Sequence, residues 1–509
     1  MPQPFTIAIV ATALALCFIG SIVYNKFFHP LSHLPGPPFA SCCDLWYRMV
    51  LVRGTLPFDL LDLHERYGPV VRFAPDRISF SSYADLRIIH CTHSIPKHRM
   101  YRSFEWGQEH TFSTNNAAFS KKRKRMLTPV FAPQSISRLE PLIYEVGTFA
   151  TLRRMYRQCA RSKLEGNKAG VDLYRLFFDL AFNTIGRLSF GEEFQMVGNE
   201  ESDDFFVPSF VRDWWLNYVA PLKIVGLSEF KDYASKLVRN RLEKLRDLDE
   251  KHSAGDYSGG TNEVPCDILQ LMIETEDPET GERMNTRELE AEAMVMIFAG
   301  SDTSGNTLTF TFDQLFANPH VMDKLEAEVL AAFPDPSEPI SYRDAKEKLP
   351  YLEAVLMESM RIRSVGGTYA MREIPPGGRV VGGFFLPEGT MVGSPKYVIH
   401  NLTAHWDQPD VFWPERYLDG PVDVVAQRRQ DVVPFSIGVR ACIGRHLAMV
   451  EMTVAFATLI QHFKIRPPVE NYKSVEPRCW FMISPKGKRL DAHITPRVPS
   501  LMKSTVNVQ

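Results

Sequence analysis

One cysteine in this sequence has neighbours that could keep it as a reactive thiolate. Cys442 lies in the segment FSIGVRACIG, residues 435–444, with Gly438 before it, Gly444 after it and an apolar helical pattern running on to Phe463. Glycine lets backbone approach a metal closely, and amides at the start of the following helix favour negative charge on sulfur. The segment therefore predicts a metal-binding thiolate. The alternative is an ordinary buried cysteine.

A second set of polar residues interrupts a long apolar run. Residues 294–318 have an apolar helical pattern, into which Ala299, Gly300, Asp302 and Thr303 place small and polar side chains. An unpaired carboxylate in apolar surroundings costs several kcal/mol, so Asp302 needs a partner. The pattern predicts that something occupies a gap beside this helix. The alternative is an ordinary buried helix that contains serine and threonine.

Together, these motifs resemble those of the cytochrome P450 family. Phe435, Gly438, Arg440, Cys442 and Gly444 match the family's haem-binding pattern, and residues 299–303 match its Ala-Gly-x-Asp-Thr motif. The resemblance covers roughly residues 35–485. It implies the cytochrome P450 fold, which is mainly α with smaller β-sheets. It also implies one heme b, whose iron takes Cys442 as its axial thiolate ligand.

The resemblance also gives roles to the helix around Asp302. Gly300 would let the helix widen over the iron, Thr303 would donate a hydrogen bond to dioxygen, and Asp302 would relay protons from solvent. Cleavage of the oxygen bond needs two protons, and the thiolate pushes electron density towards that bond. Thr303 and Asp302 are therefore the expected catalytic residues, while Gly300 and Phe435 are expected to contact the haem.

Several basic residues are expected to pair with the haem propionates. Arg440 carries a planar guanidinium, which binds a carboxylate through two parallel hydrogen bonds. By resemblance, Arg372 is a further partner and His400 another, although a lone histidine is as often a core residue. The basic run at 121–125 should supply one more, either Lys124 or Arg125. Its remaining lysines could form a docking patch for an acidic reductase.

Glu358, Arg361 and Arg416 are expected to form a structural cluster. The spacing of Glu358 and Arg361 on one helical face contributes only tenths of a kcal/mol alone. However, the segment FWPER, residues 412–416, resembles the family segment that supplies a second arginine. The three would be buried together and fix the loop that leads to Cys442. Loss of one partner should cost about 3 to 5 kcal/mol, with loss of haem.

The elements that position these residues should form one large unit. The chain has 509 residues, 45% of them hydrophobic, without a repeat or a second linker rich in glycine and proline. Residues 41–509 are therefore expected to be a single haem-thiolate catalytic domain. The formal net charge of −2 argues against nucleic acid as a partner. Eight cysteines without paired spacing indicate a reducing compartment.

The N-terminal segment is expected to anchor this domain in a membrane. Residues 1–25 carry no charged side chain, and Phe5–Tyr24 is almost wholly apolar, enough for a helix of about 30 Å. A cleaved signal peptide is the alternative. Lys26 and His29 then predict a single-pass protein of the endoplasmic reticulum membrane, with its catalytic domain on the cytoplasmic side. Residues 26–40 form a stiff, proline-rich hinge.

Aromatic residues gather where members of the family hold their substrates. They are Tyr101, Phe104, Trp106, Phe112, Phe205, Phe206, Phe210, Trp214, Trp215, Tyr218, Trp480 and Phe481. These residues could line an apolar pocket, pack a core or, for residues 205–218, lie at the membrane interface. In the loop after Arg361, Thr368 or Tyr369 is available as a hydrogen-bond donor.

The predicted activity is insertion of one oxygen atom of O2 into a lipophilic small molecule. The sequence has no flavin or nicotinamide fingerprint, so electrons from NADPH would arrive through a separate NADPH-cytochrome P450 reductase, with cytochrome b5 as a further candidate partner. The segments at Pro30-Leu31 and 67–75 look like members from filamentous fungi, many of which act in secondary-metabolite pathways. The alternatives are a reductase-independent haem-thiolate isomerase, dehydratase or peroxygenase, and a haem-based sensor or electron carrier.

Overall fold

The computed structural model describes residues 4–105, 107–166, 168–191, 225–253, 266–367 and 369–498. Most elements are helices, which confirms the predicted fold class. The helices are α1 (Pro4–Val23), α2 (Pro38–Cys42), α3 (Leu45–Arg53), α4 (Leu56–Tyr67), α5 (Tyr83–His90), α6 (Ala117–Val130), α7 (Pro133–Ile143), α8 (Ala150–Leu164), α9 (Leu173–Phe190), α12 (Val225–Ser253), α13 (Ile268–Glu274), α14 (Thr286–Ala317), α15 (Pro319–Ala332), α16 (Tyr342–Lys348), α17 (Pro350–Ile362), α18 (Lys396–Asn401), α19 (Val422–Asp431) and α20 (Arg445–His462).

The strands are short and form small sheets beside the helices. They are β1 (Val70–Ala74), β2 (Arg77–Phe80), β3 (Gly170–Asp172), β4 (Arg372–Glu373), β5 (Arg379–Val381), β6 (Phe384–Leu386), β7 (Met391–Gly393), β8 (Phe463–Arg466), β9 (Pro477–Cys479), β10 (Ile483–Pro485) and β11 (Asp491–Pro496). The largest described sheet has the order β1-β2-β7-β4, in which β2 and β7 run parallel. Because β4 closes this sheet, Arg372 is fixed at its edge.

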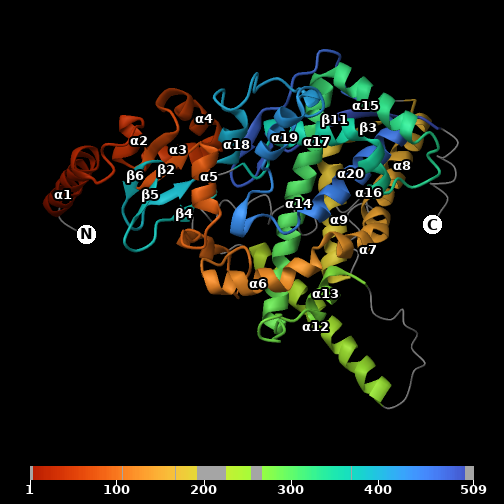
Figure 1. Cartoon of the computed structure of the whole chain (residues 1–509), viewed down its shortest axis with the longest axis horizontal. Coiled ribbons are helices and arrows are strands. Elements are labelled where there is room, and N and C mark those ends of the chain that lie inside the picture. Colours follow the sequence, from red (N-terminus) through yellow and green to blue (C-terminus); the bar gives the residue numbers. More distant parts are fainter. Residues whose placement is uncertain are drawn as a thin grey trace.

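Helix α14 runs through the centre of the molecule (Figure 1). Its first turn is closed by a capping box between Asn285 and Glu288, and most of its residues are buried. It packs closely against α9, because Gly305 leaves no side chain between the two helices. A Cβ at this position would lie 3.1 Å from the Phe178 Cα. The long apolar run in the sequence thus becomes the central helix of the fold.

A large apolar cluster joins α14 to α20, the helix that begins just after Cys442. Phe312 of α14 and Phe456 of α20 are fully buried, with ring centroids 4.5 Å apart. Phe177 of α9 also stacks on Phe312, with ring centroids 5.5 Å apart. Offset aromatic pairs of this kind add to the free energy gained by burial. The cluster fixes α14 relative to α20. The predicted site lies at the middle of α14 and just before the start of α20.

The N-terminal helix α1 projects from one end of the molecule, next to α2 (Figure 1). The described apolar side chains of α1 are mostly exposed. Among the described residues, no helix combines the length and apolar character needed to cross a membrane. Residues 1–8 and Ala11 have side chains outside this description. The predicted transmembrane anchor is therefore not confirmed.

The predicted hinge packs onto the body. Leu31, Leu34 and Ala40 are buried, and the Arg72 backbone N–H of β1 donates to the Pro35 carbonyl at 2.7 Å. The buried Arg72 guanidinium also donates to the Asn25 carbonyl at 3.0 Å. These hydrogen bonds hold Asn25 and Pro35, at the start and near the end of this segment, against β1.

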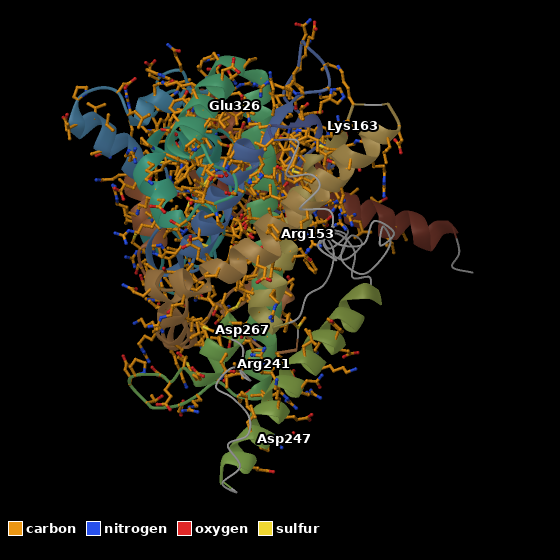
Figure 2. All side chains as sticks on the ribbon, turned by 90° about the vertical axis from the view of Figure 1, so that its right-hand side faces the viewer. Arg153, Lys163, Arg241, Asp247, Asp267 and Glu326 are labelled. Carbon is orange, nitrogen blue, oxygen red and sulfur yellow. The ribbon has the colours of Figure 1, made fainter. Side chains whose placement is uncertain are left out.

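Helix α12 extends away from the body (Figures 1 and 2). Figure 2 shows Arg241 of α12 pointing to Asp267 where the two segments meet, whereas Asp247 lies farther out along the helix. The Arg241 Nη2 lies 2.8 Å from the Asp267 Oδ2, and both side chains are buried. Asp267 also accepts from the Gln270 backbone N–H, so the pair joins α12 to the first turn of α13.

Candidate active site

A cavity of about 370 Å³ lies between the middle of α14 and the segment that contains Cys442. Helix α14 contributes Gly300 and Thr303 to its lining, and the segment before α20 contributes Phe435 and Cys442. Most of the lining is apolar. The two sequence motifs, more than a hundred residues apart, therefore face one cavity, as predicted.

The segment before α20 holds Cys442 by its backbone conformation. The Cys442 N–H donates to the Phe435 carbonyl at 2.8 Å, which closes the loop. Gly438 has φ +77°, and a Cβ there would overlap the His90 carbonyl at the end of α5. Only glycine fits this close approach without strain. The glycine that was noticed in the sequence is thus required by the fold.

The Cys442 side chain is reached from the cavity and is otherwise surrounded by protein. Burial raises the pKa of the Cys442 thiol, while the Gly444 N–H and the positive charges of Lys396 and Arg445 oppose that shift. The predicted stabilisation of the thiolate by the following amide is present, but burial outweighs it. A bound metal ion would deprotonate the thiol outright. Cys442 is therefore suited to act as a metal ligand.

Among the described residues, four cations without an acidic side chain in ion-pair contact line the cavity, namely Lys97, Arg372, Lys396 and Arg440; we call Lys97, Arg372 and Arg440 the cavity rim. Burial lowers the pKa of these three, and the positive charge of Arg372 lowers it further at Lys97 and Arg440, to about 10 for Arg440. The Arg440 Nη1 is buried without a hydrogen-bond partner in the described parts of the chain. Lys97 Nζ donates to the Phe112 carbonyl at 2.6 Å.

This cavity rim fits the carboxylates of haem. Like charges that face one another in a buried place raise the free energy of the fold unless an anion joins them. The two haem propionates would supply this negative charge. They would also give the unpaired Arg440 Nη1 a hydrogen-bond acceptor. Lys97 was missed in the sequence, because only the tertiary fold brings the segment before α6 to the cavity.

The other predicted propionate partners do not line the cavity. Arg125 is bound through two hydrogen bonds of 3.0 Å to Asp277. Lys124 Nζ donates to the Val439 carbonyl at 3.4 Å, beside the loop that holds Arg440. Of the two, Lys124 is therefore the one near the site.

His400 has a structural position and not the predicted haem contact. Its Nε2 accepts from the Val433 backbone N–H at 2.9 Å, and burial lowers its pKa to about 3. His400 does not line the cavity, and its Nδ1 is buried without a hydrogen-bond partner in the described residues. His400 instead holds the start of the segment that leads to Cys442.

Helix α14 contains no widened turn. Its hydrogen-bonding pattern is α-helical from Thr286 to Ala317, so the predicted widening at Gly300 is wrong for this structure. A Cβ on Gly300 would lie 2.8 Å from the Ile185 Cγ1, which means that glycine is needed here for packing against α9. It also leaves space in the cavity wall.

Thr303 and Asp302 point in different directions. Thr303 lines the cavity, and its hydroxyl donates to the Ala299 carbonyl at 2.7 Å. Asp302 does not line it; Asn306 Nδ2 lies 3.2 Å from its Oδ1. Burial raises the pKa of Asp302, and Lys488 opposes that shift. The carboxyl group is thus held by Asn306, one turn later on the same helix, and lies outside the cavity lining.

A buried acid in the cavity lining was missed in the sequence. Glu451 of α20 lines the cavity, and burial raises its pKa to about 7, partly opposed by the hydroxyls of Ser304 and Thr184. The signal that could have found it is the one used for Asp302, a carboxylate inside an apolar helical run.

The predicted structural cluster forms, and we call Glu358, Arg361 and Arg416 the brace. Arg361 binds both carboxylate oxygens of Glu358, at 2.8 and 2.9 Å, and Arg416 Nε donates to Oε1 at 3.0 Å. Tyr417 donates to Oε2 at 2.8 Å. Arg361 Nη1 also donates to the His400 carbonyl at 2.7 Å, so the brace is connected through His400 to the segment before Cys442.

Aromatic rings form part of the cavity lining. Tyr101, Phe112 and Phe481 line it, and Phe104 packs on Phe112 and Phe481 at 5.4 and 5.6 Å between centroids. Trp480 is not in the lining; its indole N–H donates to the Val52 carbonyl. The Tyr369 hydroxyl is not free for a substrate, since it lies 2.7 Å from the Ile78 carbonyl. Trp106, Thr368 and residues 205–218 lie outside the described residues.

Comparison with known proteins identifies a family. The family described as Cytochrome P450 matches residues 36–491. Two curated relatives are the cytochrome P450 monooxygenases macH of Penicillium terrestre and tpeC of Talaromyces stipitatus. The first is 29% identical and the match covers 87% of this chain and 88% of the relative; the second is 30% identical, with 91% and 92% covered.

Two further similarities extend this result. Averantin hydroxylase of Dothistroma septosporum is 27% identical, and the match covers 89% of this chain and 84% of that protein. The crystal structure of the cytochrome P450DA heme domain superposes with a TM-score of 0.75 over 92% of this chain and 98% of that chain, at 19% identity. At that identity the superposition establishes the fold alone.

Proposed function

The chain belongs to the cytochrome P450 family, and from this we propose that it inserts one oxygen atom of O2 into a lipophilic small molecule. Its curated relatives are P450 monooxygenases, so the chain is an oxidoreductase of this kind. One observation carries the proposal. Cys442 and Thr303 face the same cavity, whose cavity rim holds cations without an acidic partner.

The cavity residues would hold the cofactor in a defined orientation. Heme b, when bound through the Cys442 thiolate, supplies the chemistry that activates dioxygen. Arg372 and Arg440 would bind its propionates, because buried guanidinium groups form short, charge-assisted hydrogen bonds with carboxylates. Phe435 lines the same cavity and would pack against the ring edge.

Protons would be held and moved by α14. The Thr303 hydroxyl donates to the carbonyl one turn earlier and can rotate into the cavity, where it would act as a donor. Because burial raises the pKa of Asp302, this carboxyl group can hold a proton closer to neutral pH than an exposed aspartate can. The charge of Lys488 acts on Asp302, and a charged side chain in this place supports a path that brings protons to the carboxyl group.

The substrate would be apolar and would contact aromatic rings. Tyr101, Phe112 and Phe481 contribute rings to the lining, together with Met296 and Val365. Such a surface binds neutral, lipophilic molecules by removing them from water. The curated relatives are fungal proteins, and one is named for hydroxylation of averantin. This supports a role in a fungal secondary-metabolite pathway.

Electrons would come from NADPH through a separate reductase, with cytochrome b5 as a second donor. Lys121 and Lys124 lie on α6, and Lys124 donates to the Val439 carbonyl of the loop that holds Arg440, whereas Lys122 is paired with Glu282. Positive charge near the site attracts an acidic partner.

We also propose that α1 anchors the protein in the endoplasmic reticulum membrane, with the catalytic domain on the cytoplasmic side. Leu14, Leu16 and Phe18 of α1 are all more than half exposed to solvent, which is unfavourable unless lipid or protein covers them. We expect the full chain to stay in membranes after alkaline carbonate extraction. A variant without residues 1–25 should be released. Extraction of the full chain would contradict this anchor.

The function is tested with the full chain expressed in yeast membranes. We expect the reduced protein with carbon monoxide to show the shifted Soret band of a thiolate-bound haem, and product formation from lipophilic metabolites to require NADPH and reductase. The Thr303→Ala variant should keep the band, but it should release hydrogen peroxide and form no product. Product formation without reductase would support an isomerase, dehydratase or peroxygenase, and absence of the band would exclude the thiolate ligand.

A further inference from the structure

A buried carboxylate of α14 holds a segment that contributes to the cavity wall. Glu292 is only 1% exposed and does not itself line the cavity, but it lies four residues before Met296, which does. Its Oε1 accepts two hydrogen bonds of 2.9 Å from Thr111, one from the backbone N–H and one from the hydroxyl. Hydrogen bonds to a carboxylate are stronger than those to a neutral acceptor. Glu292 therefore binds the segment before α6 to α14.

Residues 110–114, which we call the wall segment, also have hydrogen bonds of their own. His110 is fully buried, and its Nδ1 accepts from the Phe112 backbone N–H at 3.3 Å. The His110 Nε2 lies 2.9 Å from the Phe104 carbonyl oxygen. These hydrogen bonds connect Phe112 to the residues beside it, so a contact at Thr111 also sets the position of Phe112.

Phe112 is the residue of the wall segment that faces the cavity. Its ring centroid lies 6.4 Å from that of Phe298 on α14 and 6.0 Å from that of Phe481. Its carbonyl accepts the hydrogen bond from Lys97 of the cavity rim. The position of the wall segment therefore sets an aromatic face of the cavity and the acceptor of a cavity-rim lysine.

Arg123 of α6 makes a second use of Glu292. The Arg123 Nη2 lies 2.5 Å from the Glu288 Oε1, and its Nε lies 3.3 Å from the Glu292 Oε1. Two carboxylates of α14 thus share one buried arginine. Within the described residues, Thr111 donates to Glu292 and makes no hydrogen bond to Glu288. The two glutamates form a matched pair, because only one of them holds the wall segment.

We propose that Glu292 is a positioning residue: by accepting both hydrogen bonds of Thr111 it fixes the Phe112 ring in the cavity wall, which makes the cavity selective for ligands that fit this ring. A side chain held in one position binds a ligand without the entropic cost of ordering it. This inference rests on the proposed function, because it takes the cavity to be the substrate site of a haem enzyme.

The test compares two ligands of haem iron in the full-length holoprotein. Imidazole is one small ring, whereas miconazole carries two chlorinated phenyl groups on the same ring and reaches the cavity walls. Soret titrations give both dissociation constants. We expect Glu292→Ala to weaken miconazole relative to imidazole about tenfold, the effect of one misplaced aromatic contact. Thr111→Val loses only the hydroxyl and should change this ratio about threefold. Thr111→Ser should restore it.

Glu288→Gln is the matched control. It removes the other carboxylate from Arg123 and keeps the side-chain acceptor that caps the first turn of α14, so the ligand ratio should stay unchanged. Hydrogen exchange followed by mass spectrometry gives a readout independent of the haem ligands. The amides of the wall segment should exchange at least about tenfold faster in Glu292→Ala and at the original rate in Glu288→Gln.

Each outcome decides between wall position and ion pairing. A ligand ratio that changes less than about twofold in both Glu292→Ala and Thr111→Val would overturn the inference. Equal changes in Glu292→Ala and Glu288→Gln would also overturn it, because pairing with Arg123 would then set the ratio. If Glu292→Ala does not hold haem, Thr111→Val and Thr111→Ser decide alone. Absence of the thiolate band in the unmodified protein would refute the proposed function, while hydrogen exchange would still test the hold of Glu292 on the wall segment.

Discussion

The brace and the cavity rim both bury arginine side chains, but only the brace surrounds them with acceptors. In the brace, Arg361 and Arg416 share the Glu358 carboxylate and use their remaining N–H groups on backbone carbonyls. In the cavity rim, Arg440 keeps a buried Nη1 without a partner in the described residues, and the positive charge of Arg372 lowers its pKa. Charges that hold the fold are thus matched inside it. Charges that bind a ligand remain unmatched until the ligand is present.

The largest effect is expected when the negative charge of the brace is removed. Glu358→Gln removes the shared negative charge and leaves two buried arginines, so we expect the free energy of unfolding to fall by about 3 to 5 kcal/mol. Urea unfolding followed by circular dichroism and by the Soret band would measure it. Haem should be lost together with the fold, because the brace is connected through His400 to the Cys442 segment.

The control for this variant lies on the same helix. Glu353 of α17 pairs with Arg429 at 3.0 Å, but both side chains are about one-third exposed. Glu353→Gln should therefore cost no more than about 1 kcal/mol. Equal losses for the two variants would mean that burial of the brace has no special importance.

The cavity rim should respond in the opposite way. Arg440→Met removes a cation that lacks a partner, so the fold keeps its helical content while haem is held less tightly. A charge-assisted hydrogen bond contributes about 1.5 to 3 kcal/mol, which corresponds to roughly 10- to 150-fold faster haem transfer to an excess of apomyoglobin. Arg343→Met, at an exposed position of α16, is the control and should leave the transfer rate unchanged. A loss of fold equal to that of Glu358→Gln would remove the distinction between brace and cavity rim.

Glu451 sharpens the comparison, because it is a buried acid without a cation. Its pKa of about 7 lies above that of an unfolded glutamate, 4.5, so the folded state keeps its proton as pH rises between these values and the unfolded state does not. The free energy of unfolding should therefore fall as pH rises through this window. Between pH 5.5 and 8 the loss from this group is about 2 kcal/mol. Urea unfolding at both values should show a smaller loss for Glu451→Gln; an identical loss would disprove the raised pKa.

The sequence predicted those parts of the site that consist of local patterns. These parts are Cys442 with its glycines, the polar residues within α14 and the partners of the brace. Each depends on spacing within one segment or on a motif with few alternatives. The structure brings each to the expected place. The mainly helical fold followed from the same resemblance.

The residues that were misplaced or missed depend on tertiary contacts. His400 is held by Val433, which no spacing within its own segment reveals. Lys97 reaches the cavity because the segment before α6 forms a bridge with β4, nearly three hundred residues later. The role of Gly300 depends on Ile185 of α9. Such contacts between distant segments are set by packing and leave little trace in either segment alone.

The smallest expected effect concerns Lys124 and Arg125, adjacent residues that separate the two kinds of charge. Lys124 makes one long hydrogen bond to the Val439 carbonyl beside Arg440, so it lies next to the cavity rim without lining the cavity. Lys124→Met should speed haem transfer by no more than about threefold, the effect of a weak hydrogen bond of about 0.5 kcal/mol. Arg125→Met should leave transfer unchanged, since its guanidinium is bound to Asp277. It should instead destabilise the fold, because the buried Asp277 would lose its partner. Faster haem transfer from Arg125→Met than from Lys124→Met would contradict this assignment, because it would mean that Arg125 and not Lys124 faces the haem.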